Sequence, residues 1–221
     1  MKNISIDPDL NASCPEIQLS CIACDVTIQN HNNSLWVLID QQCTELATSL
    51  KTEDIRHNKA IAAAREAYKA CGKDPARYRL SAEALLRRVV NGKGLYQINN
   101  VVDLLNLVSI STGFSIGGYD ADGIDGDIRM GIGQAGELYQ GLGRGELNIE
   151  GMPVFRDDAG AFGTSTSDSV RTGVSGETKR FLMVIVSYQA NDKLEVTTQM
   201  AIQLLTDFAE GKHFETALIE F

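Results

Sequence analysis

The stretch from Ile98 to Thr112 constrains the fold more than any other part of the sequence, because it is apolar on almost every side of a helix. Gly113 follows it, and glycine is a residue at which helices commonly stop. A helix without a polar face is usually buried inside a protein. The chain is therefore expected to enclose this helix in a hydrophobic core.

Three polar residues interrupt this apolar stretch. Asn99, Asp103 and Asn106 follow one another at offsets of four and three residues, so they fall on one face of the helix. An aspartate that hydrogen-bonds to asparagine side chains fixes the direction of their amides, and a fixed amide offers a ligand one donor and one acceptor. A stripe of this kind can equally face solvent or cap neighbouring backbone. The pattern alone leaves both interpretations open.

The other expected elements place helices early in the chain and strands late. Residues 17–28 predict a strand, and helices are expected over residues 35–50, over NKAIAAAREAYKACG and behind Ser81. Beyond Gly113 come the strand-like runs DIRMGI, MPVFRDD and RFLMVIVSY, an amphipathic helix that ends at Gly211, and the strand-like FETALIEF. Strands and helices do not alternate strictly, and no linker or repeat is visible. The sequence therefore predicts one α+β domain over residues 1–221.

The balance of charge argues against some partners. The 221 residues carry 20 Lys and Arg against 29 Asp and Glu, a formal charge of -9, which does not suit a chain coated by nucleic acid or by an anionic membrane. The first residues lack a signal-peptide pattern, and the longest strongly apolar run, Phe181 to Val186, is far below the ~18 residues of a membrane helix. The five cysteines show no disulfide-framework spacing. We expect a cytoplasmic protein with no membrane partner.

One segment has the opposite charge. Between Arg56 and Lys93 there are ten basic and three acidic residues, a net charge of +7 within the acidic chain. Basic residues around an aromatic ring, as in ARYR at Tyr78, suit a phosphate backbone with an unstacked base nearby. A solvated helix face that balances the acidic remainder explains the same charge. Charge alone does not require an RNA partner.

Three short motifs suggest metals or nucleotides, but each has a simpler interpretation. CIAC, from Cys21 to Cys24, lies in an expected strand, where residues three apart point to opposite faces and cannot share a metal. DADGIDGD lacks the side chains of a calcium-binding loop at its fifth and twelfth positions, and GLGRG lacks the spacing of a phosphate-binding loop. We expect core cysteines, an acidic turn and a tight turn, with no metal and no cofactor.

Five strings between Tyr78 and Val186 carry a resemblance to a known family: YRLSAEALLRRVV, INNVVDLLNLVSISTGFSIGGYD, IDGDIRMGIGQAGELYQGLG, VFRDDAGAFGTSTSDSVRT and ETKRFLMVIV. They resemble the B3/B4 domain of the beta subunit of phenylalanyl-tRNA synthetase, here in a free-standing form. The resemblance is strongest over residues 74–180. It implies an α+β fold with a β-sandwich-like mixed-sheet core and flanking helices.

In the synthetase this domain is the editing site, which hydrolyses the ester of tyrosine wrongly attached to the phenylalanine tRNA. The resemblance places Asn106 at the position of an asparagine that lines that site, with Asn99 and Asp103 as its supports. The family's threonine and histidine are replaced by Leu105 and Gly117. Since these polar groups are absent, the same amino-acid preference does not carry over.

The leading hypothesis is a domain that deacylates mischarged aminoacyl-tRNA in trans, with tRNA as its partner. Asn106 would orient water or the substrate carbonyl, Gly117 and Gly118 would supply backbone N–H donors, and Asp168, the acid nearest to the family's glutamate, would hold the substrate ammonium or a hydroxyl. A binding module that has lost the chemistry and a structural partner of a synthetase are the alternatives. The expected substrate-binding residues are Asn99, Asp103, Leu105 and Tyr119, and the expected tRNA-binding residues are Arg77, Tyr78, Arg79, Arg87 and Arg88.

Overall fold

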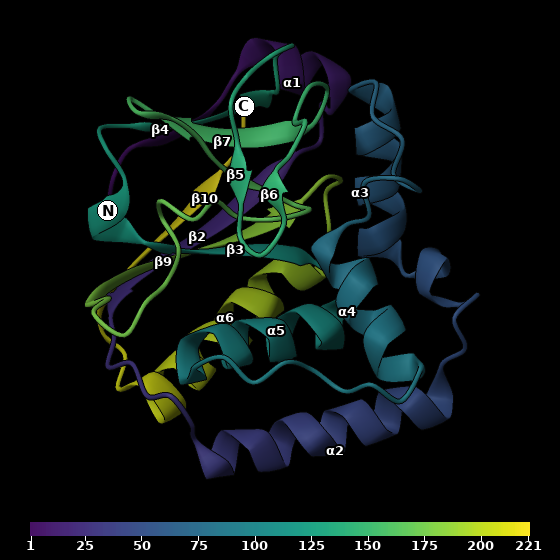
Figure 1. Ribbon diagram of the computed structural model, residues 1–221, viewed down its shortest axis with the longest axis vertical. Helices are drawn as coiled ribbons and strands as arrows, with labels where there is room; N and C mark the ends of the chain where they lie inside the picture. The colour runs from purple at the N-terminus through teal and green to yellow at the C-terminus, as the bar shows by residue number, and fades with distance from the viewer.

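Two four-stranded sheets lie one above the other, and helices cover the free face of the lower one, in the computed structural model of residues 1–221 (Figure 1). In the first sheet, one pair of strands is parallel and the others are antiparallel, in the order β1 (Ile4–Ile6), β4 (Ile128–Ile132), β7 (Pro153–Asp157) and β8 (Gly160–Thr164). The second sheet is antiparallel throughout, in the order β10 (Lys212–Ile219), β2 (Gln18–Asp25), β9 (Arg180–Ser187) and β3 (Ser115–Asp120). The short strands β5 (Gln140–Gly141) and β6 (Gly145–Glu146) form a separate hairpin.

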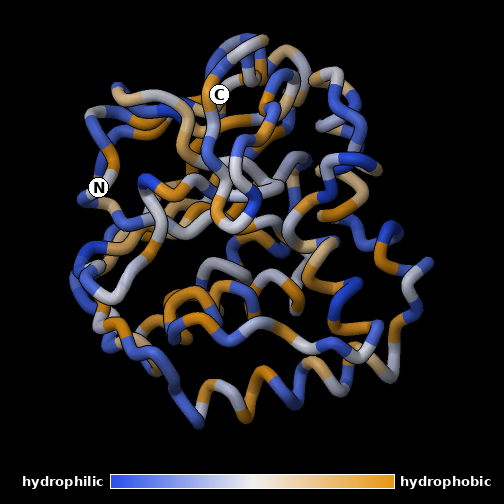
Figure 2. Tube along the Cα trace, in the orientation of Figure 1, coloured by the Kyte–Doolittle hydropathy of each residue, from blue (hydrophilic) through white to orange (hydrophobic).

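The helices gather below and beside the second sheet (Figure 1). α5 (Asn100–Thr112) and α6 (Lys193–Ala209) lie under this sheet, and α2 (Asn33–Ser49) crosses beneath them as the outermost helix. Figure 2 shows hydrophobic and hydrophilic residues alternating along α2, as expected for a helix with one face in solvent. None of the helices has the length and hydropathy that crossing a membrane requires. The remaining helices are α1 (Pro8–Ser13), α3 (Lys59–Ala70), α4 (Ser81–Val90) and the single-turn 3-10 helices η1 (Ile55–His57) and η2 (Ala121–Gly123).

The second sheet separates two hydrophobic cores. Cys21 packs into the core between the two sheets, with Phe155 and Phe162, whereas Cys24 packs into the core between the second sheet and the helices. The two cysteines therefore point to opposite faces, as predicted, and burial raises the pKa of both thiols to about 12. The architecture confirms the predicted α+β fold, with a sandwich-like sheet core and flanking helices.

α5 is buried as the sequence predicts, but it begins two residues later. Its backbone starts at Asn100, and Asn99 is the residue that caps it, accepting a hydrogen bond from the Val102 N–H at 2.9 Å. Ile98 lies outside the helix and is 52% exposed. At the other end, Gly113 takes a left-handed conformation with φ of 88°, which glycine adopts without steric cost. α5 thus lies in the middle of the helical layer with both ends defined.

The structure corrects three local predictions, at SIGGYD and at two element boundaries, and confirms two others. SIGGYD, expected to contribute free glycine N–H groups, forms β3 at the edge of the second sheet, where Gly117 lies opposite Val184 of β9. The strand predicted over residues 17–28 ends at Asp25, and Ser81 is the first residue of α4 instead of the residue before it. The tight turn predicted at GLGRG is confirmed as the tip of the β5–β6 hairpin. The strand at FETALIEF corresponds to β10.

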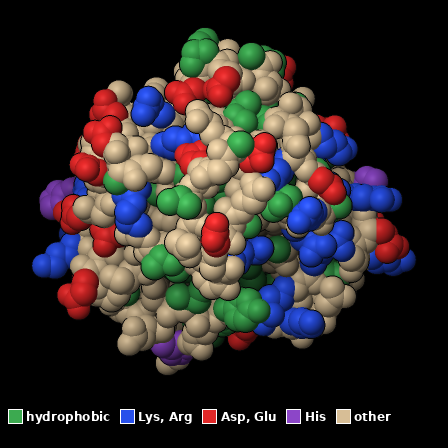
Figure 3. All heavy atoms as spheres, turned by 45° about the horizontal axis from the view of Figure 1, so that its top comes forward, with side chains coloured by type: hydrophobic (Ala, Val, Ile, Leu, Met, Phe, Trp, Pro, Cys, Tyr) green, Lys and Arg blue, Asp and Glu red, His purple; other side chains and the backbone are tan.

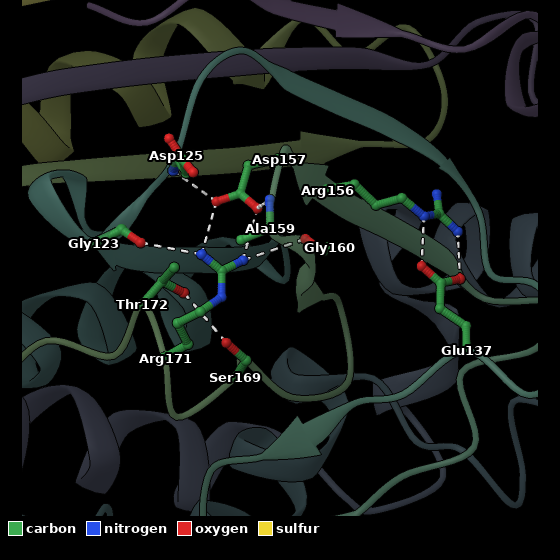
Figure 4. Close-up of polar contacts among 10 residues, drawn as sticks. All are labelled: Gly123, Asp125, Glu137, Arg156, Asp157, Ala159, Gly160, Ser169, Arg171 and Thr172. Atoms are coloured by element: carbon green, nitrogen blue, oxygen red, sulfur yellow. Dashed lines mark hydrogen bonds and ion pairs between the residues drawn. The ribbon is translucent and has the colours of Figure 1, made fainter.

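Asp157 ties together the loops at one end of the first sheet (Figure 4). Both of its oxygens accept hydrogen bonds from Arg171 at 2.8 Å, and the backbone N–H groups of Asp125 and Ala159 donate to the same carboxylate. Burial alone would raise the pKa of Asp157, but these hydrogen bonds outweigh it and hold that pKa below its usual range. The acidic turn at Asp125 and the loop that carries Arg171 are therefore fixed to the β7–β8 hairpin.

Candidate functional site

A cavity of about 760 Å³ opens beside α4 and α5. It is lined by one face of α4, one face of α5 and the segment that joins these two helices. The β5–β6 hairpin and Thr166 complete the lining. Figure 3 shows Lys and Arg side chains gathered on the right-hand part of this face, near a hollow in which hydrophobic side chains are also exposed. A second cavity, of about 730 Å³, lies beside α3 and contains none of the residues predicted for catalysis, substrate binding or tRNA binding.

Asn106 presents a free amide to the first cavity. The residue is 9% exposed and its side chain makes no hydrogen bond within the protein. The amide of Asn100, in contrast, is fully engaged: it donates to the Thr27 and Phe208 carbonyls and accepts from the Gln29 N–H. Its amide atoms are not among the fully buried, unpaired polar atoms of the chain, so they are open to the cavity and available to a ligand.

The other two residues of the polar stripe have a different role. Asp103 accepts hydrogen bonds from the Ile98 N–H at 2.9 Å and from the Trp36 indole N–H at 2.8 Å. Burial raises its pKa, and these two hydrogen bonds act in the opposite direction. Neither Asp103 nor Asn99 bonds to Asn106, so the predicted fixing of its amide by an aspartate is not what the structure contains. They instead cap the start of α5 and attach it to α2.

Gly117 and Tyr119 belong to a buried cluster outside the cavity. A Cβ atom at Gly117, or at Gly163 of β8, would collide with the Tyr119 hydroxyl, so the two glycines leave room for this ring. The Tyr119 hydroxyl donates a hydrogen bond to Asp168 at 2.9 Å, and the ring is fully buried. Gly117 and Tyr119 therefore contribute to the packing between the two sheets and do not line the cavity.

Gly118 and Leu105 also lie away from the cavity lining. They face each other: a Cβ atom at Gly118 would come within 2.6 Å of the Leu105 side chain. Asp168, on the loop after β8, is partly buried beside Tyr119 and does not line the cavity either. Of the residues predicted for catalysis or substrate binding, the cavity contains Asn106 alone.

The predicted tRNA-binding arginines divide into paired and unpaired groups. Glu83, buried on α4, accepts hydrogen bonds from Arg65 at 2.7 Å and from Arg87 at 3.0 Å, and Arg79 lies 3.7 Å from the same carboxylate. Arg88 has no acidic partner and lies over the ring of Tyr96, 3.6 Å from its centroid. Arg87 and Arg88 both line the cavity, so the acid holds one of them in place and leaves the other free to bind an anion.

The ARYR segment lies before α4 and outside the cavity lining. Arg77 and Arg79 are exposed, whereas Tyr78 is partly buried under Lys73, whose ammonium lies 4.0 Å from the ring centroid. Its ring is therefore less open to a base than the sequence pattern indicates.

Comparison with known proteins agrees with this architecture. A model of the B3/4 domain family matches residues 63–209, about two thirds of the sequence. The chain belongs to the B3/4 domain family. Its fold is similar to that of an N-terminal fragment of the phenylalanyl-tRNA synthetase beta-subunit from Pyrococcus horikoshii, with a TM-score of 0.51 and 16% sequence identity over 98% of this chain and 50% of that one. The chain thus spans about half the length of that fragment, and no curated protein matches it in sequence.

The cavity of this B3/4 domain also contains residues that the sequence analysis did not single out. Tyr96 and Ile98 come from the segment between α4 and α5, and Arg144 comes from the glycine-rich hairpin. Further polar groups come from Ser81, Asn91, Lys93 and Thr166. Lys93 was visible as part of the basic segment. Arg144 stands inside the GLGRG string, but its approach to the cavity depends on how the hairpin packs, for which the sequence gives no signal.

The lining contains no His, Cys, Asp or Glu. Nowhere in the chain do three or more such residues lie close enough together to hold a metal ion. The cavity therefore offers a ligand two side-chain amides, hydroxyl groups, an aromatic ring and several cations. Such a set favours a ligand with negative charge and hydrogen-bonding groups.

Asp168 makes the stability of this B3/4 domain dependent on pH. Burial raises its pKa to about 7, although hydrogen bonds from the Tyr119 hydroxyl and the Gly118 N–H act in the opposite direction. Between the ordinary pKa of 3.8 and this value, the folded state holds a proton that the unfolded state has lost. The free energy of unfolding therefore decreases as pH rises through that window and stays low above it.

We expect Asp168→Asn to raise the free energy of unfolding at about pH 8 by about 1–2 kcal/mol, a range reduced because the side chain is partly exposed. Near pH 3.5, where aspartate is mostly protonated in both states, the two proteins should differ little. Thermal unfolding followed by circular dichroism at both pH values checks this. An equal difference at the two pH values would show that the effect does not come from ionisation.

Proposed function

We propose that residues 1–221 act as one domain that binds the aminoacylated 3′ end of a tRNA in the cavity and hydrolyses the ester between the amino acid and the ribose. Membership of the B3/4 family supports this proposal, as does a fold similar to part of a tRNA synthetase subunit. The observation that carries it is the free amide of Asn106, which opens into a cavity whose lining is otherwise cationic or neutral.

Hydrolysis of an aminoacyl ester requires few catalytic groups from the protein. Water attacks the carbonyl carbon, the bond from that carbon to the ribose oxygen breaks, and the proton of the water passes to the ribose, which leaves free amino acid and uncharged tRNA. An oriented water and a donor aimed at the developing oxyanion are sufficient to accelerate such a step. The Asn106 amide lines the cavity, makes no hydrogen bond within the protein, and can donate to this oxygen or hold the water. In this proposal it is the catalytic residue.

The cations account for binding. Arg88, Lys93 and Arg144 line the cavity and form no ion pair with an acid in the protein. Phosphates next to the reacting ester would lie against these side chains, which position the RNA without reading its sequence. The local positive charge also explains how a chain with a net charge of -9 binds a polyanion.

A second candidate function is binding of the same RNA end without hydrolysis. The specific observation in its favour is a lining without His, Cys, Asp or Glu, since these are the residues that usually supply a general base or a nucleophile. Under this alternative, Asn106 contributes affinity alone. The two candidates share the ligand and differ in whether the ester is cleaved.

The decisive experiment incubates the full chain with a panel of tRNAs that carry radiolabelled wrong amino acids. We expect at least one ester to be lost faster than in buffer, at protein concentrations where fluorescence anisotropy shows the tRNA to be bound. Binding of the panel without faster loss from any member would select the binding module. Failure to bind any aminoacylated or uncharged tRNA would reject both candidates.

A further inference from the structure

Arg88 carries the one buried side-chain nitrogen or oxygen in the chain that has no hydrogen-bond partner, its Nε atom. Its guanidinium stacks on the ring of Tyr96 at 3.6 Å, and both residues line the cavity. The nearest acid on the same helix, Glu83, is already occupied by Arg65 and Arg87. A buried N–H without an acceptor is unfavourable, and the guanidinium as a whole makes no hydrogen bond or ion pair within the protein, so its terminal N–H groups are available to an acceptor brought by a ligand.

Tyr96 adds a second recognition element. Arg88 covers part of the Tyr96 ring, yet Tyr96 is 60% exposed. An exposed aromatic ring beside a guanidinium is a surface on which a nucleobase stacks, since every base has a π-face and the cation strengthens the contact. An amino acid with an acidic side chain would use Arg88 but would gain nothing from this ring.

The charges of the cavity lining also favour an anionic ligand such as a nucleotide. Lys93 and Arg144 add positive charge, and no Asp or Glu lines the cavity to attract a cationic ligand. Asn106 supplies an unpaired amide that can bond to a ribose hydroxyl or to a base edge. The cavity, at about 760 Å³, has the size of ordinary small-molecule sites.

We propose that Arg88 and Tyr96 form a binding site for one nucleotide, with a phosphate oxygen on the Arg88 guanidinium and the base stacked on Tyr96. This inference deepens the proposed function, because it names the part of the RNA end that the cavity holds. It also applies to a free nucleotide, and that makes it testable without any tRNA.

The test titrates AMP, adenosine, ribose 5-phosphate and glutamate into the full chain by calorimetry. We expect AMP to bind most tightly, because it alone among these probes engages both residues. Arg88→Gln and Arg88→Lys should each weaken AMP binding by about tenfold or more, since lysine keeps the charge but lacks the planar donor. Tyr96→Leu should weaken AMP by about tenfold and leave ribose 5-phosphate unchanged, whereas Tyr96→Phe should bind AMP like the parent.

Arg129→Gln is the matched control, because Arg129 is exposed on β4 of the first sheet and forms no ion pair. It should leave AMP binding unchanged, and thermal unfolding of each variant verifies its fold. AMP affinity that does not change in Arg88→Gln and Tyr96→Leu, no binding of AMP by the parent, or glutamate binding as tightly as AMP would overturn the proposal. AMP binding that depends on both residues in a protein without deacylase activity would uphold the nucleotide site and reject the hydrolysis.

Discussion

Asn106→Ala is expected to lower kcat for ester hydrolysis by about 10²–10³-fold, the usual effect of removing one donor to a developing oxyanion. Asn106 contributes an unpaired amide to the cavity, and the lining contains no Asp, Glu or His that could act as a general base in its place. The affinity for tRNA should change by less than about threefold, because the cations supply most of the binding. Single-turnover deacylation together with anisotropy separates the two quantities.

Two comparisons make this result interpretable. Asn3→Ala removes an exposed asparagine near the start of the chain and should leave both turnover and affinity unchanged. Asn106→Asp keeps the size of the side chain but replaces its donor by a negative charge, so it should be at least as slow as the alanine variant. If Asn106→Ala instead lost affinity and kept its kcat, the residue would serve in binding, and the catalytic role proposed for it would be wrong.

The sequence predicts α5 well because its signal is local. An almost continuous apolar surface followed by Gly113 specifies a buried helix whatever the rest of the chain does. The roles of Asn99 and Asp103 are less predictable, since the same spacing serves a ligand-facing stripe and a helix cap. Which of the two applies depends on where the helix begins, and boundaries shift by a few residues without changing the periodicity.

Contacts between distant segments explain the other differences. Gly117 and Gly118 are expected from the sequence to supply backbone N–H donors to a ligand, but they lie within β3, where Tyr119 and Leu105 require the absence of side chains at these positions. Tyr96 and Arg144 carry no periodic signal, and they meet at the cavity only because the α4–α5 segment and the β5–β6 hairpin converge there. Asn106 could be singled out because a family resemblance added information that spacing lacks.

Glu83→Gln is expected to lower the free energy of unfolding by about 3 kcal/mol, near the lower end of the range for breaking a buried ion pair. The Glu83 carboxylate is 1% exposed and is shared by Arg65, Arg79 and Arg87, which are themselves partly exposed. Glutamine fills the same space but leaves the three guanidinium groups without a counter-charge and turns one acceptor into a donor that faces them. Because the arginines retain some contact with water, the upper end of the range is not expected.

The matched control for this variant is Glu66→Gln, which removes an acid of α3 that pairs with Lys69 at 2.7 Å but is 71% exposed. A surface pair of this kind contributes less than about 0.5 kcal/mol, because water screens it. In a protein of this length, the expected difference corresponds to a decrease in Tm of about 6–12 °C for Glu83→Gln and about 2 °C or less for Glu66→Gln. Equal, small changes in both variants would mean that Glu83 does not hold the arginines of α4 in place, and the geometry of the cationic side of the cavity would then need another explanation.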